Sequence, residues 1–202
     1  MPRIAGQIDR VKNEAILNAT SEVLFERGLT APLDEIARRA GVSKQTIYNH
    51  YGSKAELVKA LIERRVTSLT APLDVPGADA FPEAALASYA RGLLETVTME
   101  RGVALFRLII ESVPASPELA QAVFAAGPGA SRSRLAAFLQ REARLGRLKI
   151  DNPTEAAEFF AGMVISQHQM QALLGLPSAL TAERLERIAT EAARRFMRAY
   201  AP

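Results

Sequence analysis

Hydrophobic residues recur at helical spacing along almost the whole chain. In the first predicted helix, which Gly28 ends, one stripe contains Val11, Ala15, Ile16, Ala19 and Val23. Strand-type alternation never extends beyond a few residues, and the sequence has no repeat period or low-complexity tract. The pattern therefore predicts an all-α protein.

Glycine, proline and capping residues divide this pattern into successive helices. In the first third of the chain, we expect further helices at residues 33–40, 44–51 and 54–70. Ser53 and Glu56 have the spacing of a capping box, which predicts that the last of these helices begins at Lys54. Two prolines and a glycine then mark residues 71–79 as a loop.

The rest of the chain also has helical periodicity, with a predicted break at Gly127-Pro128-Gly129. The expected helices are 82–98, 100–113, 117–126, 131–145, 154–174 and 181–199. This makes nine or ten helices in two unequal parts. We place an N-terminal helix-turn-helix domain at residues 1–60 and a larger helical domain at 61–202, joined by the helix that begins at Lys54.

The segment from residue 33 to residue 51 has the pattern of a helix-turn-helix. Ala37 is small enough for a second helix to cross closely, and Gly41 can adopt the positive φ that a tight turn after a helix needs. Val42 can fill the turn from inside, and Ser43 can cap the next helix. Ile47 is the expected anchor of that helix to the core.

The residue pattern of the short helix at residues 44–51 predicts that its outer face is polar. If Ile47 points inward, Gln45 and Asn49 lie about 160° away on the helical wheel. The outward residues include no acid and are Lys44, Gln45, Thr46, Tyr48, Asn49 and His50. Gln and Asn can pair with adenine, Lys can reach guanine, and Thr, Tyr and His can bind phosphates. The alternative is a two-helix corner in an unrelated helical protein.

The charge distribution favours an anionic partner for the N-terminal part. The chain has 25 Lys and Arg and 22 Asp and Glu, and the first 65 residues carry 11 and 8 of these, so all the net positive charge lies there. The chain has no cysteine, which excludes disulfides, thiolate zinc sites and a cysteine nucleophile.

Residues 8–61 resemble the N-terminal domain of TetR/AcrR-family transcriptional regulators. The resemblance rests on Ala-Ile-Leu-Asn-Ala-Thr at 15–20, Leu-Phe-Glu-Arg-Gly-Leu-Thr at 24–30, Ile-Ala-Arg-Arg-Ala-Gly-Val-Ser at 36–43 and Thr-Ile-Tyr-Asn-His-Tyr-Gly-Ser-Lys-Ala-Glu-Leu at 46–57. It implies that residues 44–51 form the recognition helix. Tyr48, His50 and Lys54 would then meet phosphates, and Thr30 would contact the DNA backbone. The predicted DNA-binding set is Thr30, Ser43, Lys44, Gln45, Thr46, Tyr48, Asn49, His50 and Lys54.

The resemblance also implies a homodimeric regulator, which we interpret as a repressor of a palindromic operator on double-stranded DNA. A small-molecule effector, which the sequence does not identify, would bind among the C-terminal helices and release the DNA. The expected pocket residues are Met99, Phe106, Arg107, Phe124, Phe138, Met163 and Gln167. The alternatives are plain core for the apolar members and, for Arg107, a solvated helix face with Glu111.

Residues 159–182 contain no charged side chain. Gln167, His168, Gln169 and Gln171 near the middle, and Pro177, argue against a membrane span. A helix with so few charges must be covered on more than one side, which predicts a dimer interface with the last helix. The expected interface residues are Ala161, Ile165, His168, Leu185, Ile188 and Phe196. For His168, one hypothesis is a ligand contact or a pH-sensitive group at the interface. The other, which we favour, is a histidine satisfied at a helix–helix contact.

Catalytic and metal-binding motifs are missing from the sequence. It has no glycine-rich phosphate loop, no nucleophile elbow and no His–Glu metal helix, and only two histidines. We therefore expect no enzyme activity, no cofactor and no metal.

The first residues have no secretion signal, so we expect a cytoplasmic protein without membrane association. The competing hypotheses are an all-α ligand-binding or enzymatic protein with an incidental helix-turn-helix, and a helical scaffold that acts only through protein contacts.

Overall fold

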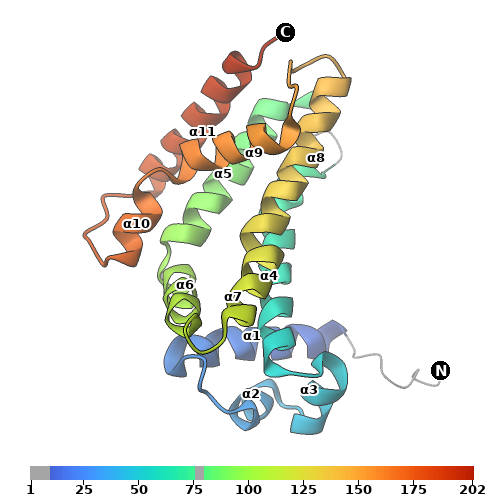
Figure 1. The fold of residues 1–202 in the computed structure, drawn as a ribbon, viewed down its shortest axis with the longest axis vertical. Helices are drawn as coiled ribbons and strands as arrows, with labels where there is room; N and C mark the ends of the chain where they lie inside the picture. Colours follow the sequence, from blue (N-terminus) through green and yellow to red (C-terminus); the bar gives the residue numbers. More distant parts are fainter. Residues whose placement is uncertain (1–9, 76–79) are drawn as a thin grey trace, which may run out of the picture.

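The computed structural model describes residues 10–75 and 80–202, and within them it contains helices and no strand, which confirms the all-α prediction (Figure 1). The α-helices are α1 (Arg10–Arg27), α2 (Leu33–Ala40), α3 (Lys44–Tyr51), α4 (Lys54–Thr70), α5 (Pro82–Thr98), α6 (Glu100–Ser112), α7 (Pro117–Phe124), α8 (Ala130–Arg144), α9 (Pro153–Ile165), α10 (His168–Leu173) and α11 (Ala182–Ala199). A 3₁₀ turn, η1 (Ala71–Leu73), follows α4, and a π-helical segment, η3 (Ala125–Gly129), joins α7 to α8.

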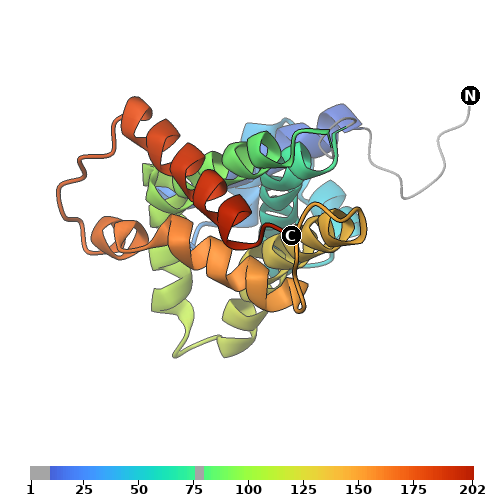
Figure 2. The ribbon, with the colours of Figure 1, turned by 90° about the horizontal axis from the view of Figure 1, so that it is seen from above.

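Two hydrophobic clusters hold the helices together. The first lies among α1 to α4 and includes Ile36 and Ile47, and residues of α6, α7 and η3 also contribute to it. The second lies among α5, α8, α9 and α11, with Phe138 and Phe160 in its centre. In Figures 1 and 2, α5 and α11 run side by side along one flank of this second cluster.

Helix α4 connects the two parts without a break. Ser53 caps its first turn, because the Ser53 side chain accepts a hydrogen bond of 3.1 Å from the Glu56 N–H, as the capping-box spacing predicts. Leu57 and Leu61 near its beginning are buried in the first cluster. The helix continues across residue 60 to Thr70, so the division at residues 60 and 61 stays a prediction.

The helix expected at residues 154–174 is in fact two helices. Helix α9 ends at Ile165, and Ser166 has a φ of 44° and a ψ of −131°, a strained conformation for a residue with a side chain. The chain turns there, and α10 then packs against α5 and α6 instead of extending α9 (Figure 2). The prediction was wrong because neither glycine nor proline marks the turn.

The predicted break at residues 127–129 was also wrong. The chain passes from α7 to α8 through the π-helical segment Ala125–Gly129, which contains Pro128. Proline has no N–H to donate, and the wider π turn accommodates it where an α-helix would kink. Gly127 lies against α4, because a Cβ atom built there would be 3.1 Å from Cγ2 of Ile62.

The charge-free stretch of residues 159–182 covers the end of α9, all of α10 and the loop before α11. Among the described residues, no helix combines the length and the apolar character needed to cross a membrane.

Candidate DNA-binding surface and ligand pocket

The turn between α2 and α3 has the geometry that its sequence predicts. Gly41 adopts a left-handed conformation with a φ of 66°, which would strain any residue with a side chain. The N–H of Val42 donates to the carbonyl oxygen of Ala37 at 3.0 Å, closing the end of α2. The Ser43 side chain accepts from the N–H of Thr46 at 3.0 Å and caps α3. Helix α3 is therefore held at a fixed angle to α2.

The outward side of α3 presents amides at the positions that the helical wheel predicts. Ile47 is 1% exposed and anchors the helix, whereas Gln45 and Asn49 are exposed on its other side. Lys44 donates to Asp34 at 2.8 Å, and this hydrogen bond and the charge of Asp34 raise the pKa of Lys44. Lys44 would therefore have to exchange Asp34 for a base or a phosphate.

The residues predicted to meet phosphates lie around the same surface. Tyr48 and His50 are exposed near the end of α3, and Thr30 is exposed in the loop before α2. Thr46 is half-buried, and its hydroxyl lies 2.8 Å from that of Ser43. Thr46, Tyr48 and His50 thus lie on the same short helix as the exposed amides of Gln45 and Asn49.

Lys54 has a more constrained position than the sequence indicates. Its amino group donates to the carbonyl oxygens of both Leu29 and Ala31, and burial lowers the pKa of Lys54. Lys54 therefore holds the loop that carries Thr30. An ammonium group has three N–H donors, so one of them is left for a phosphate.

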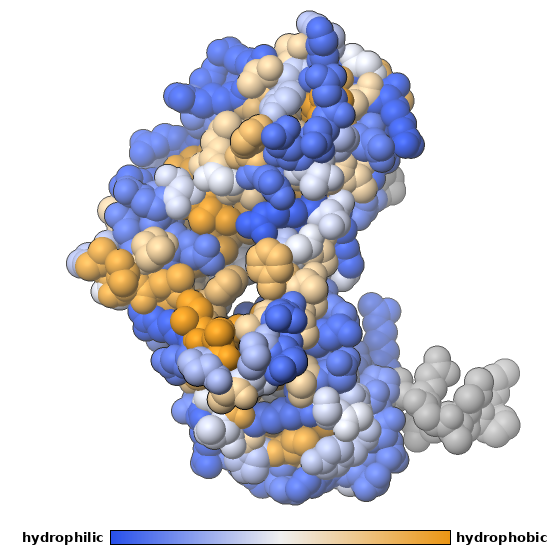
Figure 3. Space-filling model, viewed as in Figure 1, coloured by the Kyte–Doolittle hydropathy of each residue, from blue (hydrophilic) through white to orange (hydrophobic). Residues whose placement is uncertain are grey.

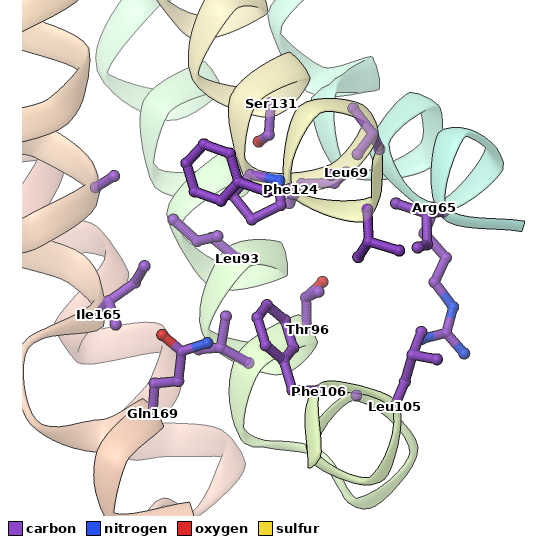
Figure 4. Close-up of a pocket in the computed structure, with 18 of the residues that line it drawn as sticks. Arg65, Leu69, Leu93, Thr96, Leu105, Phe106, Phe124, Ser131, Ile165 and Gln169 are labelled. Carbon is purple, nitrogen blue, oxygen red and sulfur yellow. The ribbon is translucent and has the colours of Figure 1, made fainter. Parts of the chain in front are cut away.

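A cavity of about 240 Å³ lies between the two hydrophobic clusters, and residues of every helix from α4 to α10, with η3, border it (Figure 4). Its wall is mainly apolar, and the rings of Phe106 and Phe124 project into it from α6 and α7. Three of its polar groups are satisfied within the protein. The hydroxyl groups of Tyr89 and Ser131 lie 2.8 Å apart, and Thr96 donates to the carbonyl of Gly92 at 2.7 Å.

Two family models match the chain, and together they cover both of its parts. The model for bacterial regulatory proteins of the tetR family matches residues 16–61, which include the helix-turn-helix. The model for the C-terminal domain of AefR-like transcriptional repressors matches residues 84–202, more than half of the chain. This protein belongs to the TetR family. It is a transcriptional regulator and not an enzyme.

Known TetR-type regulators resemble the chain in two different ways. The transcriptional activator FasR of Mycolicibacterium smegmatis is 51% identical over 55 residues, which are 27% of this chain and 25% of FasR, so the match spans only about a quarter of that relative. The structure of the flavonoid-responsive regulator FrrA is 34% identical, covers 95% of this chain and 97% of its own, and has a TM-score of 0.70. A TetR-family regulator from Mesorhizobium loti MAFF303099 is 25% identical, with a TM-score of 0.75, over 96% of this chain and 100% of its own.

Only two of the seven pocket residues that we expected in this TetR-family chain line the cavity, Phe106 and Phe124. Phe138 is buried in the second cluster, and Met99 and Met163 are 54% and 42% exposed. Gln167 lies in the turn before α10, outside the cavity wall, whereas Gln169 lines it. For Gln167 the difference follows from the turn at Ser166, which changes the residues of α10 that face inward.

Arg107 does not line the cavity either. Its guanidinium donates to the carbonyl oxygens of Leu173 at 3.0 Å and Ala172 at 3.1 Å, at the end of α10. It therefore caps α10 and fastens it to α6.

Arg65 lines the cavity from α4, although it was not among the expected pocket residues. Arg65 lies at helical spacing with the apolar residues Ile62, Val66 and Leu69, and all four line the cavity. A charged residue within such a stripe was a signal that could have identified it.

Three of the residues expected at the dimer interface are buried inside the subunit, which corrects that prediction. Ala161, Leu185 and Phe196 are at most 7% exposed and belong to the second cluster. Ile165 and Ile188 are half-buried against the same cluster. The buried faces of these helices cover the core of the subunit itself, so Ala161, Leu185 and Phe196 are not available to a second copy. His168 is half-buried at the start of α10, and its place at a dimer interface stays a prediction.

The outward side of α9 instead carries Phe159 and Met163, which are 58% and 42% exposed and one turn apart. Gly162 lies beside them, and a Cβ atom built there would meet nothing within 4 Å. Further apolar side chains, Met170, Leu174 and Leu176, are exposed over α10 and the loop that follows it. In Figure 3, apolar residues gather at the left of the molecule and border a hollow in this face.

Proposed function

We propose that this TetR-family regulator binds a palindromic DNA operator through α3 and represses transcription until a small effector enters the cavity. The observation that carries the proposal is the outward face of α3, where the exposed amides of Gln45 and Asn49 share one side of a helix fixed by Gly41 and Ser43. A short helix with exposed amides and no acid suits the major groove.

Selection from randomised duplex DNA with the full chain tests the operator proposal. We expect enrichment of a palindrome whose half-sites lie about 34 Å apart, one helical turn, or a multiple of it. The double variant Gln45→Ala, Asn49→Ala should lose the enrichment. Gln121→Ala, at an exposed position of α7, is the matched control and should keep it. Equal retention of all sequences by the wild-type protein would contradict operator binding.

We propose that the dimer forms through the outward side of α9, with Phe159, Gly162 and Met163 at its centre. Phe159 and Met163 are exposed apolar side chains one turn apart, and their burial against a second copy would be favourable in free energy. Gly162 supports this assignment, because the packing of its own subunit does not require a glycine there and a partner helix could approach closely. A twofold dimer places two recognition helices against the two halves of a palindrome.

Repression is proposed because the matching C-terminal family model describes a transcriptional repressor, although FasR is an activator. A reporter gene behind a promoter that carries the selected operator distinguishes repression from activation. Repression predicts lower transcription with the regulator than without it, and activation predicts the reverse. The proposed location is the cytoplasm, where the operator would lie.

The flavonoid-responsive relative FrrA suggests an aromatic effector. The cavity of this chain is about 240 Å³, below the roughly 300 Å³ at which sites for drug-sized ligands usually begin. We therefore propose an effector smaller than a three-ring flavonoid. Thermal-shift assays with a flavonoid and with single-ring aromatic compounds test this size limit, because only the smaller compounds should raise the melting temperature.

A further inference from the structure

The Arg65 side chain forms part of the wall of an apolar cavity, and its guanidinium lies at the edge of that cavity, where it binds Ser21. It lines the cavity together with Ile62, Val66 and Leu69 of the same helix, and Figure 4 shows its side chain beside Leu105 of α6. Burial is the main cause that lowers the pKa of Arg65, followed by the nearby charges of Arg64 and Arg101. An arginine nevertheless stays protonated in a protein, so the cavity keeps this positive charge.

No carboxylate of the described residues balances that charge inside the cavity. The residues that line it include two arginines, Arg65 and Arg132, and no Asp or Glu. Within residues 10–75 and 80–202, no ion pair involves Arg65, whereas the preceding Arg64 pairs with Glu14 at 2.8 Å. Removing a cation from water without a counter-ion is costly, and an anionic ligand would offset that cost.

The size and the lining of the cavity restrict the body of such a ligand. An apolar cavity of about 150 Å³ can hold benzene. The present cavity, of about 240 Å³, is large enough for one ring and a short chain. Phe106 and Phe124 supply aromatic surface on its walls. The cavity therefore suits a small ligand that is apolar at one end and negatively charged at the other.

Arg65 also contacts the DNA-binding part of the chain. Its Nη2 donates to the hydroxyl of Ser21 on α1 at 3.0 Å. Arg64 donates at 2.8 Å to both Glu14 and Asn18 on the same helix. Two adjacent arginines of α4 thus bind α1, which packs directly on α2, and only the second of them lines the cavity.

We propose that the cavity binds a small aromatic monocarboxylate and that Arg65 exchanges its hydrogen bond to Ser21 for the carboxylate. A guanidinium offers a planar fork that fits both oxygens of a carboxylate, which a hydroxyl cannot match. Loss of the bond to Ser21 would loosen α1 from α4 and thereby change the position of α2 and α3. This inference rests on the proposed effector function, and it adds the charge of the effector and the residue that senses it.

Calorimetric titration of the full chain tests the ligand class. The probes are 3-phenylpropionate and 3-phenylpropanamide, which differ little in size. The first carries a negative charge, whereas the second is neutral. We expect the carboxylate to bind at least tenfold more tightly to the wild-type protein. Arg65→Gln should abolish this preference, whereas the control Arg64→Gln, which alters the neighbouring contact to α1 outside the cavity, should keep it. Equal affinities for the two probes, or loss of the preference in Arg132→Gln and not in Arg65→Gln, would overturn the proposal.

The variant Ser21→Ala tests the exchange. Without the competing hydroxyl, we expect the carboxylate to bind about two- to tenfold more tightly, in line with the loss of one hydrogen bond. By linkage, 3-phenylpropionate should then weaken operator binding less than it does in the wild-type protein. An unchanged effect on operator binding in Ser21→Ala would refute the exchange. Release of the operator by a neutral ligand alone would leave the effector function standing and reject this inference.

Discussion

Nε2 of Gln45 donates a hydrogen bond of 2.7 Å to Oδ1 of Asn49, one turn further along α3. The bond couples the two amides that the helical wheel places on the outward side, and each amide keeps further donors and acceptors for bases. The pair therefore presents its polar groups to the outside of α3 in a shared orientation.

We expect Gln45→Ala and Asn49→Ala to relax the preference at particular base pairs, because each removes an amide that can pair with a base edge. A lost bidentate contact should cost roughly 1–3 kcal/mol for the preferred base. Affinities for single-base operator variants measure the effect. The two losses should not add, because the side chains are bonded to each other. An unchanged base preference in both variants would remove these residues from the set that reads the sequence.

Lys54→Ala should weaken binding to every DNA sequence by a similar factor. The substitution removes the hydrogen bonds that hold the loop carrying Thr30, and with them the ammonium group that we propose to contact a phosphate. The slope of log affinity against log salt should fall by about one. Lys59→Ala, which removes a lysine paired with Glu56 on the same helix, is the control. A loss confined to the operator would show that Lys54 takes part in reading bases.

Substitutions on the two sides of the α9–α11 layer should have different effects. Phe159→Asp places a charge on the exposed side of α9 and should give folded monomers that no longer bind the operator. Phe196→Ala instead removes a ring that is 1% exposed and packs edge-on against Phe160 at 5.0 Å. It should lower the free energy of unfolding by roughly 3–5 kcal/mol.

Light scattering and urea unfolding separate these two outcomes. A dimeric, DNA-binding Phe159→Asp variant would contradict the proposed interface. A Phe196→Ala variant that dissociates at unchanged stability would restore the interface expected from the sequence.

Acid should destabilise the protein partly through Glu191. Hydrogen bonds from Arg194 and Arg195 hold the pKa of Glu191 at about 2, below its ordinary value of 4.5. Since the folded state has the lower pKa, the stabilisation is complete above about pH 4.5 and is lost as the pH falls through about 2. Glu191→Gln should therefore show a shallower loss of stability in that window, with Glu183→Gln on the same helix as the control. Identical acid profiles for Glu191→Gln and the wild-type protein would contradict this role.

The local signals in the sequence predicted the helix-turn-helix well. The conformation of Gly41, the cap at Ser43 and the burial of Ile47 each follow from interactions among residues close together in the chain. Such interactions are encoded by residue type and spacing, so they can be read without knowledge of the tertiary structure.

Tertiary packing decided what the sequence could not predict. The turn at Ser166 has no glycine or proline to mark it, and it redirects α10 so that Gln169, not Gln167, lines the cavity. Periodicity identifies an apolar stripe but not the surface that covers it. For that reason Phe196 and Leu185 were expected at a dimer interface although they fill the core of the subunit.

The π-helical segment joins α7 and α8 into one continuous rod, which has a consequence for unfolding. Val123 and Ala126 of this rod belong to the first cluster, and Leu135 and Phe138 belong to the second. If one cluster unfolds, one end of the α7–α8 rod loses its packing. The other cluster is then destabilised, because residues of the same rod form part of it. The protein should therefore melt in a single cooperative transition, in which the DNA-binding part and the ligand-binding part lose their structure together.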